Sequence, residues 1–194
     1  MVLRLYLDAA VHAAVQTMPQ ALERHEQTQV AHALLPREGI SSMADIKLNI
    51  SHSGAWLAAA WSPQAAIGVD IEAIRPMQWL GDDAVLAAVL HPDEIKWLNA
   101  GTPAQRVQRG LMSWCRKEAL LKAMGLGLAS GFPLAGIGHS PDGSLHILPA
   151  SLERMCDAGR ANDWHTHSDW IDDEEHGRQA ALAVAWRRVE DAAT

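Results

Sequence analysis

The chain has 194 residues, 48% of them hydrophobic and 20% charged, which is typical of a globular protein with one sizeable core or two small packed halves. Its formal charge of −7, from 23 acidic against 16 basic residues, argues against a nucleic-acid-binding protein, because such a protein needs a basic surface. The two cysteines form no CxxC pair, which argues against a disulfide framework or a cysteine zinc site and predicts a reducing, cytoplasmic location.

The first third of the chain predicts a strand, a helical stretch and a pair of strands. Apolar residues alternate with Arg4 near the N-terminus, and a stretch rich in Ala, Gln, Glu and His follows. In order, the predicted elements are a strand at 2–7, a helix at 9–35 divided by Pro19, and strands at 46–50 and 55–61 around a turn at 51–54. No apolar run approaches the roughly 18 residues of a membrane span, and the N-terminus lacks the features of a signal peptide.

The central third predicts one further strand and then three helices. The strand, at 66–71, leads to Asp70 and Glu72 and places both on one face, because side chains alternate along a strand. Pro92 and Pro103 stand where prolines are tolerated in the first turn of a helix. The predicted helices cover 77–90, 92–99 and 103–124.

The last third predicts shorter strands joined by turns. A Pro-Asp-Gly turn at 141–143 separates the first two strands, and a polar loop at 172–177 separates the last two. These strands are predicted at 134–138, 144–148, 163–171 and 179–187. The order of strand, helix, strands, helices and strands indicates the α+β class.

Carboxylates and lysines recur at spacings that suit a metal and phosphate site. Asp70 and Glu72 are either solvated groups at a strand end or hard oxygen ligands for Mg²⁺. Glu118 and Lys122 are either an ordinary i, i+4 helix pair or part of the same site, where lysines would offset the charge of a pyrophosphate. The helix residues that share one stripe are Trp114, Lys117, Glu118, Leu121 and Lys122.

Two segments and their spacing resemble a known signature. Residues 68–72 are Gly-Val-Asp-Ile-Glu, and residues 114–122 are Trp-Cys-Arg-Lys-Glu-Ala-Leu-Leu-Lys. They resemble the pattern G-(V/I)-D followed by (F/W)-x-x-K-E-(A/S)-x-x-K of the 4′-phosphopantetheinyl transferase superfamily. Residues 49–54, Asn-Ile-Ser-His-Ser-Gly, resemble a further motif of its surfactin-synthetase-activating type. This resemblance implies a monomer of two similar α/β halves related by a pseudo-twofold axis, which we expect at 1–66, shortened, and at 67–194, carrying the metal site.

The resemblance also implies a reaction and its residues. The 4′-phosphopantetheine group of coenzyme A would pass to a serine of an apo acyl, peptidyl or aryl carrier protein, with release of 3′,5′-ADP. The implied residues are Asp70, Glu72 and Glu118 for Mg²⁺ (or Mn²⁺), Glu118 and Lys122 for catalysis, Lys117 and Lys122 for the phosphates, and Ser51 and His52 for the 3′-phosphate of coenzyme A.

One departure from the family pattern keeps alternatives open. A basic Lys-Pro element precedes the Asn-Ile-Ser-His-Ser motif in longer members, but here Arg37 is the only base in that region. A catalytically weak regulator that binds coenzyme A or a carrier protein is therefore one alternative. An unrelated Mg²⁺-dependent pyrophosphate enzyme is another, although it leaves Ser51 and His52 unexplained. Three arginines of the motif helix are expected either to edge a docking surface for an acidic carrier or to be solvated: Arg106, Arg109 and Arg116.

Overall fold

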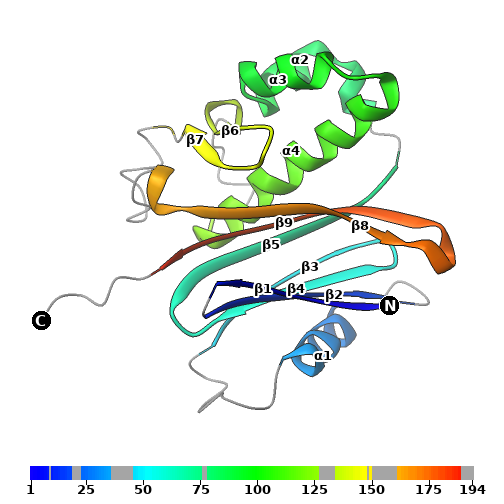
Figure 1. The fold of residues 1–194 in the computed structure, drawn as a ribbon, viewed down its shortest axis with the longest axis vertical. Helices are drawn as coiled ribbons and strands as arrows, with labels where there is room; N and C mark the ends of the chain where they lie inside the picture. Colours follow the sequence, from blue (N-terminus) through cyan, green and yellow to red (C-terminus); the bar gives the residue numbers. More distant parts are fainter. Residues whose placement is uncertain are drawn as a thin grey trace, which may run out of the picture.

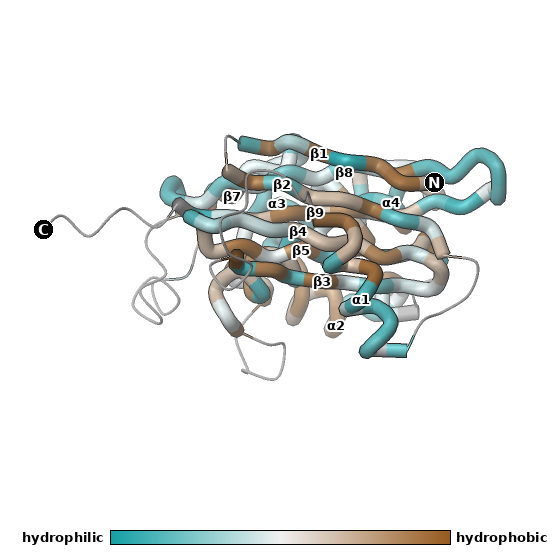
Figure 2. The backbone as a smooth tube through the Cα atoms, turned by 90° about the horizontal axis from the view of Figure 1, so that it is seen from below, coloured by the Kyte–Doolittle hydropathy of each residue, from teal (hydrophilic) through white to brown (hydrophobic). Residues whose placement is uncertain are grey.

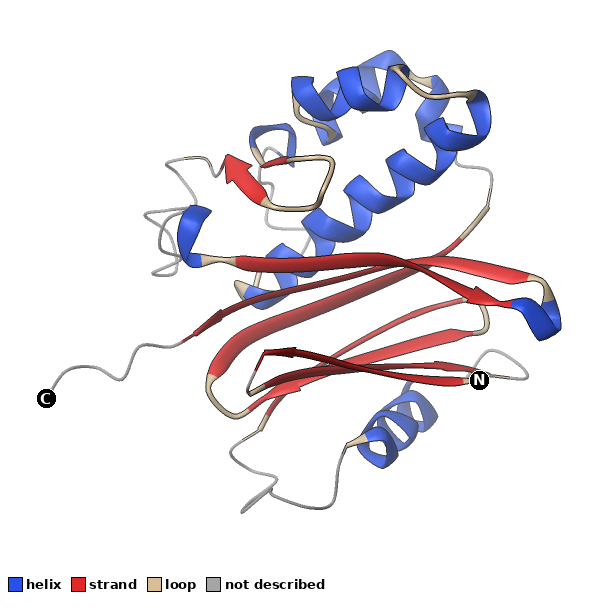
Figure 3. Ribbon diagram, viewed as in Figure 1, coloured by secondary structure: helices blue, strands red, loops and turns tan. Residues whose placement is uncertain are grey.

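Two antiparallel sheets pack face to face, with a helix outside one sheet and a helical layer outside the other (Figures 1 and 3). The computed structural model describes residues 1–8, 10–18, 23–35, 46–75, 78–126, 134–147, 149 and 161–188. In Figure 2 hydrophobic segments appear on several strands, among them β1 and β9, whereas helix α1 is largely hydrophilic. The α+β class is therefore confirmed. Core residues lie between the two sheets, and further core residues lie between each sheet and the helices that cover its outer face.

The first sheet has the strand order β1-β2-β4-β3 and is packed on its outer side by α1. Its elements are β1 (Val2–Asp8), β2 (Val11–Thr17), α1 (Arg24–Leu34), β3 (Lys47–Ser53) and β4 (Trp56–Ser62). Every residue of β4 is buried, because one face meets α1 and the other meets the second sheet. Its three consecutive alanines at 58–60 suit a strand that is covered on both faces.

The second sheet has the strand order β5-β9-β8. Its strands are β5 (Ala65–Ala73), β8 (His165–Asp173) and β9 (Arg178–Arg188). On β9 the larger residues Leu182 and Val184 face the first sheet, whereas Ala181, Ala183 and Ala185 face α4 (Pro103–Ala123). Small side chains on this face let the helix approach the sheet closely.

The remaining elements form the layer above the second sheet (Figure 1). They are η2 (Gln78–Gly81), α2 (Asp83–Val89), α3 (Pro92–Asn99), η4 (Leu134–Gly136), β6 (Gly138–His139), β7 (Leu145–Ile147) and η5 (Ala161–Asp163), whereas η6 (Glu174–His176) connects β8 to β9. Side chains of Asp82, His91 and Thr102 accept backbone N–H groups at the starts of α2, α3 and α4. None of the helices in the described ranges combines the length and the apolar character that crossing a bilayer requires.

Three sequence-based predictions were wrong. Residues 11–17, predicted as helix, form β2, which pairs with β1 and β4 along its whole length. Residues 51–53, predicted as a turn, extend β3, and the chain turns instead at Gly54, whose φ is +57°. Most of the strand predicted at 134–138 is the 3₁₀ turn η4. Tertiary pairing decided the first two cases, since it overrides local composition.

The change from the first sheet to the second falls near the predicted boundary between residues 1–66 and 67–194. The first sheet uses strands that end at Ser62, and the second begins with β5 at Ala65. The boundary, the shortening of the first half and the pseudo-twofold axis remain predictions. Pro19 and Arg37 lie outside the described residues.

Candidate active site

Strand β5 presents two carboxylates on one face, as the alternation of the strand predicted. Val69 and Ile71 point into the core between the sheets, so Asp70 and Glu72 point the other way. Asp70 is only 4% exposed, and Glu72 is half-buried with Arg75 Nη2 3.3 Å from its Oε2. Asp70 is therefore not a solvated residue at a strand end.

Strand β3 supplies polar side chains to the free edge of β5. Ser51 Oγ donates to Asp70 Oδ1 at 2.8 Å, and Ser53 Oγ donates to Glu72 Oε2 at 2.7 Å. Asn49 stands two residues before Ser51, on the same face of β3, and its Oδ1 accepts the backbone N–H of Val69 at 3.0 Å. The alternate residues of β3 thus hold both carboxylates in place across the junction of the sheets.

Helix α4 adds a lysine to this network. Lys122 Nζ donates to Asp70 Oδ1 at 2.7 Å, to Ser51 Oγ at 3.1 Å and to the backbone carbonyl of Val69 at 3.1 Å. The ammonium group has three donors, and each has an acceptor here. Of the two sequence-based interpretations of Lys122, the structure supports membership of the carboxylate site, since its ion-pair partner is Asp70.

Glu118 lies one turn before Lys122 on α4, and the charges of Asp70 and Glu72 act on its carboxyl group. Burial raises the pKa of Glu118, and Asp70 raises it further, while Lys122 opposes the shift and Glu72 adds to it. Burial also raises the pKa of the Cys115 thiol well above its usual value, with Asp70 contributing. Cys115 is therefore a packed thiol rather than a nucleophile, whereas Glu118 is a carboxylate of increased basicity.

The donor set fits a divalent cation that prefers oxygen ligands. Asp70 Oδ2 is buried and has no hydrogen-bond partner within the described residues, although Oδ1 has two. A buried carboxylate oxygen without a partner is costly unless a cation or water completes it. The oxygens of Asp70, Glu72 and Glu118 do not form one of the described clusters whose ligand atoms all lie within 4.8 Å. The site therefore has the chemistry that Mg²⁺ uses, with carboxylates that would have to approach one another around it.

Ser51 and His52 point to opposite faces of β3, because neighbouring residues of a strand alternate. Ser51 is buried on the side of β5, whereas His52 is exposed on the side of α1. His52 lines a cavity of about 720 Å³ together with Glu23, Gln27, Thr28, Leu48, Asn49 and Ile50. The structure thus brings Ser51 to the carboxylates and places His52 at a cavity beside α1 that Asn49 also lines.

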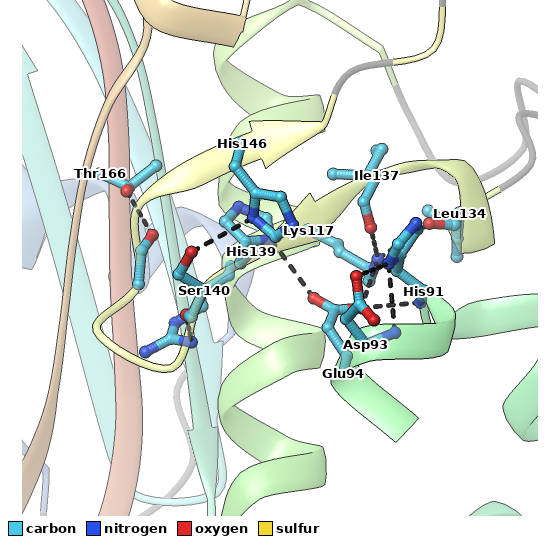
Figure 4. A network of polar contacts seen from close by, with 12 residues as sticks. His91, Asp93, Glu94, Lys117, Leu134, Ile137, His139, Ser140, His146 and Thr166 are labelled. Carbon is cyan, nitrogen blue, oxygen red and sulfur yellow. Dashed lines mark hydrogen bonds and ion pairs between the residues drawn. The ribbon is translucent and has the colours of Figure 1, made fainter. Parts of the chain in front are cut away.

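Lys117 lies in the helical layer, beside Glu94, Leu134 and Ile137 (Figure 4). Its ammonium group is buried, 2.9 Å from Glu94 Oε2, and it donates to the backbone carbonyls of Leu134 at 2.8 Å and of Ile137. Lys117 and Lys122 are five residues apart on α4, so they project from different sides of the helix. The assignment of Lys117 to the phosphates is therefore replaced by a structural role, since its donors are used within the helical layer.

The three arginines of α4 also contact the protein itself. Arg116 Nε donates to Ser168 Oγ at 2.9 Å, and its Nη atoms donate to backbone carbonyls after β6. Arg109 donates to a backbone carbonyl of α3 at 2.5 Å, and Arg106 donates to one of η2 at 3.0 Å. These contacts join α4 to its neighbours, so none of the three is simply a solvated helix residue.

Two contributors to the site were missed from the sequence, namely Asn49 and Ser53. The available signal was the period of two in Asn-x-Ser-x-Ser, which places these residues and Ser51 on one face of a strand. Because residues 51–54 were predicted as a turn, this alternation was not applied to them. The error in the element thus caused the error in the site.

Comparisons with known proteins identify the family of the chain. The model of a family described as the 4′-phosphopantetheinyl transferase superfamily matches residues 66–185. A 4′-phosphopantetheinyl transferase of Bacillus subtilis is 31% identical over 115 residues, which cover 59% of this chain and 49% of that protein. The 4′-phosphopantetheinyl transferase AcpT of Escherichia coli K12 is 28% identical over 142 residues, covering 70% of this chain and 69% of that protein.

The chain also has similarity to a solved structure and spans only part of some relatives. The ACPS–CoA complex of Chronobacterium ammoniagenes has 16% identity and a TM-score of 0.45, covering 65% of this chain and 98% of that one. The matched region spans about half the length of the B. subtilis relative. Since the family model covers more than half of the chain and includes β5, α4 and β9, the chain belongs to the 4′-phosphopantetheinyl transferase superfamily.

Proposed function

We propose that the chain transfers the 4′-phosphopantetheine group of coenzyme A to a serine hydroxyl of an apo carrier protein in a Mg²⁺-dependent reaction. The observation that supports this most directly is the network of Asp70, Ser51 and Lys122, in which one buried carboxylate oxygen has no partner within the described residues. Membership of the superfamily supports the choice of coenzyme A as substrate. We further propose that the chain acts as a monomer in the cytoplasm.

The proposed site divides the work among its residues. Asp70, Glu72 and Glu118 would hold Mg²⁺, which when bound supplies positive charge to the pyrophosphate oxygens. Lys122 keeps Asp70 and Ser51 in position with its three donors, and its positive charge would offset the charge of a phosphate group nearby. Glu118 accepts the proton of the carrier serine, directly or through a water, because its raised pKa makes it a stronger base than a solvated carboxylate.

The bond changes follow from these roles. The serine oxygen attacks the phosphorus that bears the pantetheine arm, and the bond from this phosphorus to the bridging oxygen breaks. The products are the phosphopantetheinyl serine and 3′,5′-ADP, which leaves with the bridging oxygen. The negative charge that develops on this oxygen is offset by the positive charges of the site.

Transfer is tested directly by the mass of the carrier protein. The chain is incubated with coenzyme A, Mg²⁺ and each of several apo carrier proteins, and the carriers are weighed by mass spectrometry. A gain equal to one phosphopantetheine group is expected. Binding of coenzyme A without a mass gain on any carrier would instead support a regulator that binds coenzyme A.

The first prediction concerns Asp70. Asp70→Asn keeps the shape of the side chain but removes its charge, so transfer is expected to fall by at least about a hundredfold. Circular dichroism and thermal unfolding should show a folded protein, since Ser51 can still donate to the remaining carbonyl oxygen. Full activity of this variant would refute the proposed metal role.

A further inference from the structure

A second group of potential metal ligands lies in the helical layer. His91 precedes α3, Asp93 belongs to its first turn, and His146 belongs to β7 (Figure 4). Each can offer one ligand atom such that all of these atoms lie within 4.8 Å of one another. We propose that His91, Asp93 and His146 bind a divalent cation of the Zn²⁺ class, at a site separate from the candidate active site.

The types of donor indicate the cation. Two imidazoles and one carboxylate are the ligands that Zn²⁺ and neighbouring transition metals accept, with a fourth position left for water. Mg²⁺ prefers oxygen ligands and keeps much of its water, so it is poorly matched to this set. The two proposed sites therefore differ in the metal that they favour, and excess Mg²⁺ should not block the histidine site.

Neighbouring groups already orient each ligand. Ser140 Oγ lies 3.3 Å from His146 Nδ1, and Lys96 Nζ binds Asp93 Oδ1 at 2.8 Å. The other carboxylate oxygen, Asp93 Oδ2, lies 3.6 Å from His91 Nδ1. Contacts to groups outside the ligand set, such as that of His146 with Ser140, orient metal ligands in known sites.

The position of His91 limits the affinity. Its Nδ1 accepts the backbone N–H of Asp93 at 3.2 Å and thereby caps α3. A cation bound through Nδ1 would replace this hydrogen bond, and a cation bound through the other nitrogen would require a proton on Nδ1, facing the same N–H group. In both cases the cap is lost, so binding should be weaker than at a closed structural zinc site.

The site would join two segments that are distant in sequence. His91 and Asp93 belong to the start of α3, whereas His146 belongs to the β6–β7 hairpin. Binding to the folded form alone would stabilise it and raise the unfolding temperature as the cation concentration increases.

The other described cluster is a weaker candidate. In the group of Asp173, Glu175 and His176, His176 Nδ1 lies 3.1 Å and 3.0 Å from the two oxygens of Asp173. These two ligands are therefore already paired with each other, and a cation would have to break that pair.

Zinc titration of the full chain tests the proposal. Zn²⁺ is titrated by competition with a coloured zinc indicator in millimolar Mg²⁺, for the unchanged protein, His146→Gln and the matched control His176→Gln. One saturable equivalent is expected for the unchanged protein and for His176→Gln, with affinity at least tenfold weaker in His146→Gln. His146 is exposed, so its replacement should leave the fold intact, which circular dichroism can check.

Two results would overturn the proposal. One is the absence of any saturable zinc binding, and the other is binding that His146→Gln leaves unchanged. Because zinc binding is measured without coenzyme A or a carrier, its outcome is independent of the transfer assay.

Discussion

At the scale of single residues, neighbouring positions of the motifs have different tasks. Ser51 contacts Asp70 and Lys122, whereas the next residue, His52, lines a cavity beside α1. Lys117 is used inside the helical layer, whereas Glu118 is influenced by Asp70. Adjacent residues of a motif thus lie in different environments, because neighbouring side chains point in different directions along a strand and around a helix.

Ser51 and His52 should respond differently to the 3′-phosphate of coenzyme A. Ser51→Ala removes a hydrogen bond to Asp70, so its activity should fall by a similar factor with coenzyme A and with 3′-dephospho-coenzyme A. His52→Ala should raise KM for coenzyme A alone if this residue binds the 3′-phosphate, as the family resemblance implies. Steady-state kinetics with both substrates checks the pair, and a loss in Ser51→Ala confined to coenzyme A would contradict the role that we assign to Ser51.

Removing one member of the buried pair of Lys117 and Glu94 should lower the free energy of unfolding, because the other charge is left buried without a partner. Burial lowers the pKa of Lys117, whereas Glu94 raises it and so favours the charged form. Lys117→Met leaves Glu94 without its ion-pair partner and is expected to reduce the free energy of unfolding by about 3–5 kcal/mol.

Denaturant unfolding measures this effect. Lys117→Met combined with Glu94→Gln should regain part of the loss, because no uncompensated charge remains. The matched control is Lys96→Met, which removes the exposed pair with Asp93 and should change stability little. Equal losses in Lys117→Met and Lys96→Met would contradict the role of burial.

At the scale of elements, the site depends on how closely α4 approaches β5. A Cβ atom added at Gly68 would lie 2.1 Å from the backbone oxygen of Ala119 and 2.4 Å from the backbone nitrogen of Ala123. The glycine of the Gly-Val-Asp motif is therefore required by packing, since backbone atoms cannot move aside as a side chain could. This contact sets the distance between the strand that carries Asp70 and the helix that carries Glu118 and Lys122.

Gly68→Ala should consequently move α4 away from β5. We expect a loss of about 1–3 kcal/mol in the free energy of unfolding from overpacking, together with reduced transfer activity. Gly81→Ala is the matched control, because an added Cβ there meets no atom within 4 Å. Denaturant unfolding of both variants distinguishes them, and a Gly68→Ala protein as stable as Gly81→Ala would contradict the packing argument.

At the scale of the whole molecule, the candidate site is built where the two sheets meet. β3 is the last strand of the first sheet and β5 is the first strand of the second, and side chains bridge them in place of a continuous backbone ladder. Between α3, α4 and the β6–β7 hairpin, a buried group of Glu94, Lys117 and His139 joins the helices to the hairpin (Figure 4). Both junctions place charged groups in the interior, so the stability of the whole protein should depend on pH.

His139 gives this pH dependence a direction. Burial lowers the pKa of His139 from 6.5 to about 4, although Glu94 acts in the opposite sense. Between these values the unfolded chain binds more protons than the folded one, so stability is complete above pH 6.5 and falls as the pH approaches 4. The full loss attributable to this histidine is on the order of 3 kcal/mol.

Denaturant unfolding across this pH range tests the assignment. His139→Gln removes the titrating group and should flatten the profile between pH 4 and 6.5 relative to the unchanged protein. Asp and Glu residues titrate in both proteins and provide the common background. An identical slope in both proteins would show that another group is responsible.

The sequence by itself determined the α+β class, most strands and the main helices. It could do so because apolar periodicity and motif spacing are local properties of the chain. Asp70, Glu72, Glu118 and Lys122 were predicted from these patterns; the structure pairs Lys122 with Asp70 and places Glu118 within their electrostatic influence, and the shared metal site stays a prediction.

Only the tertiary structure decided the rest. It made β2 a strand between β1 and β4, extended β3 through Ser53, separated His52 from Ser51 and directed Lys117 to Glu94. In each case the partner lies far away in the sequence. Burial and long-range pairing, rather than local preference, therefore fix which residues meet at the site.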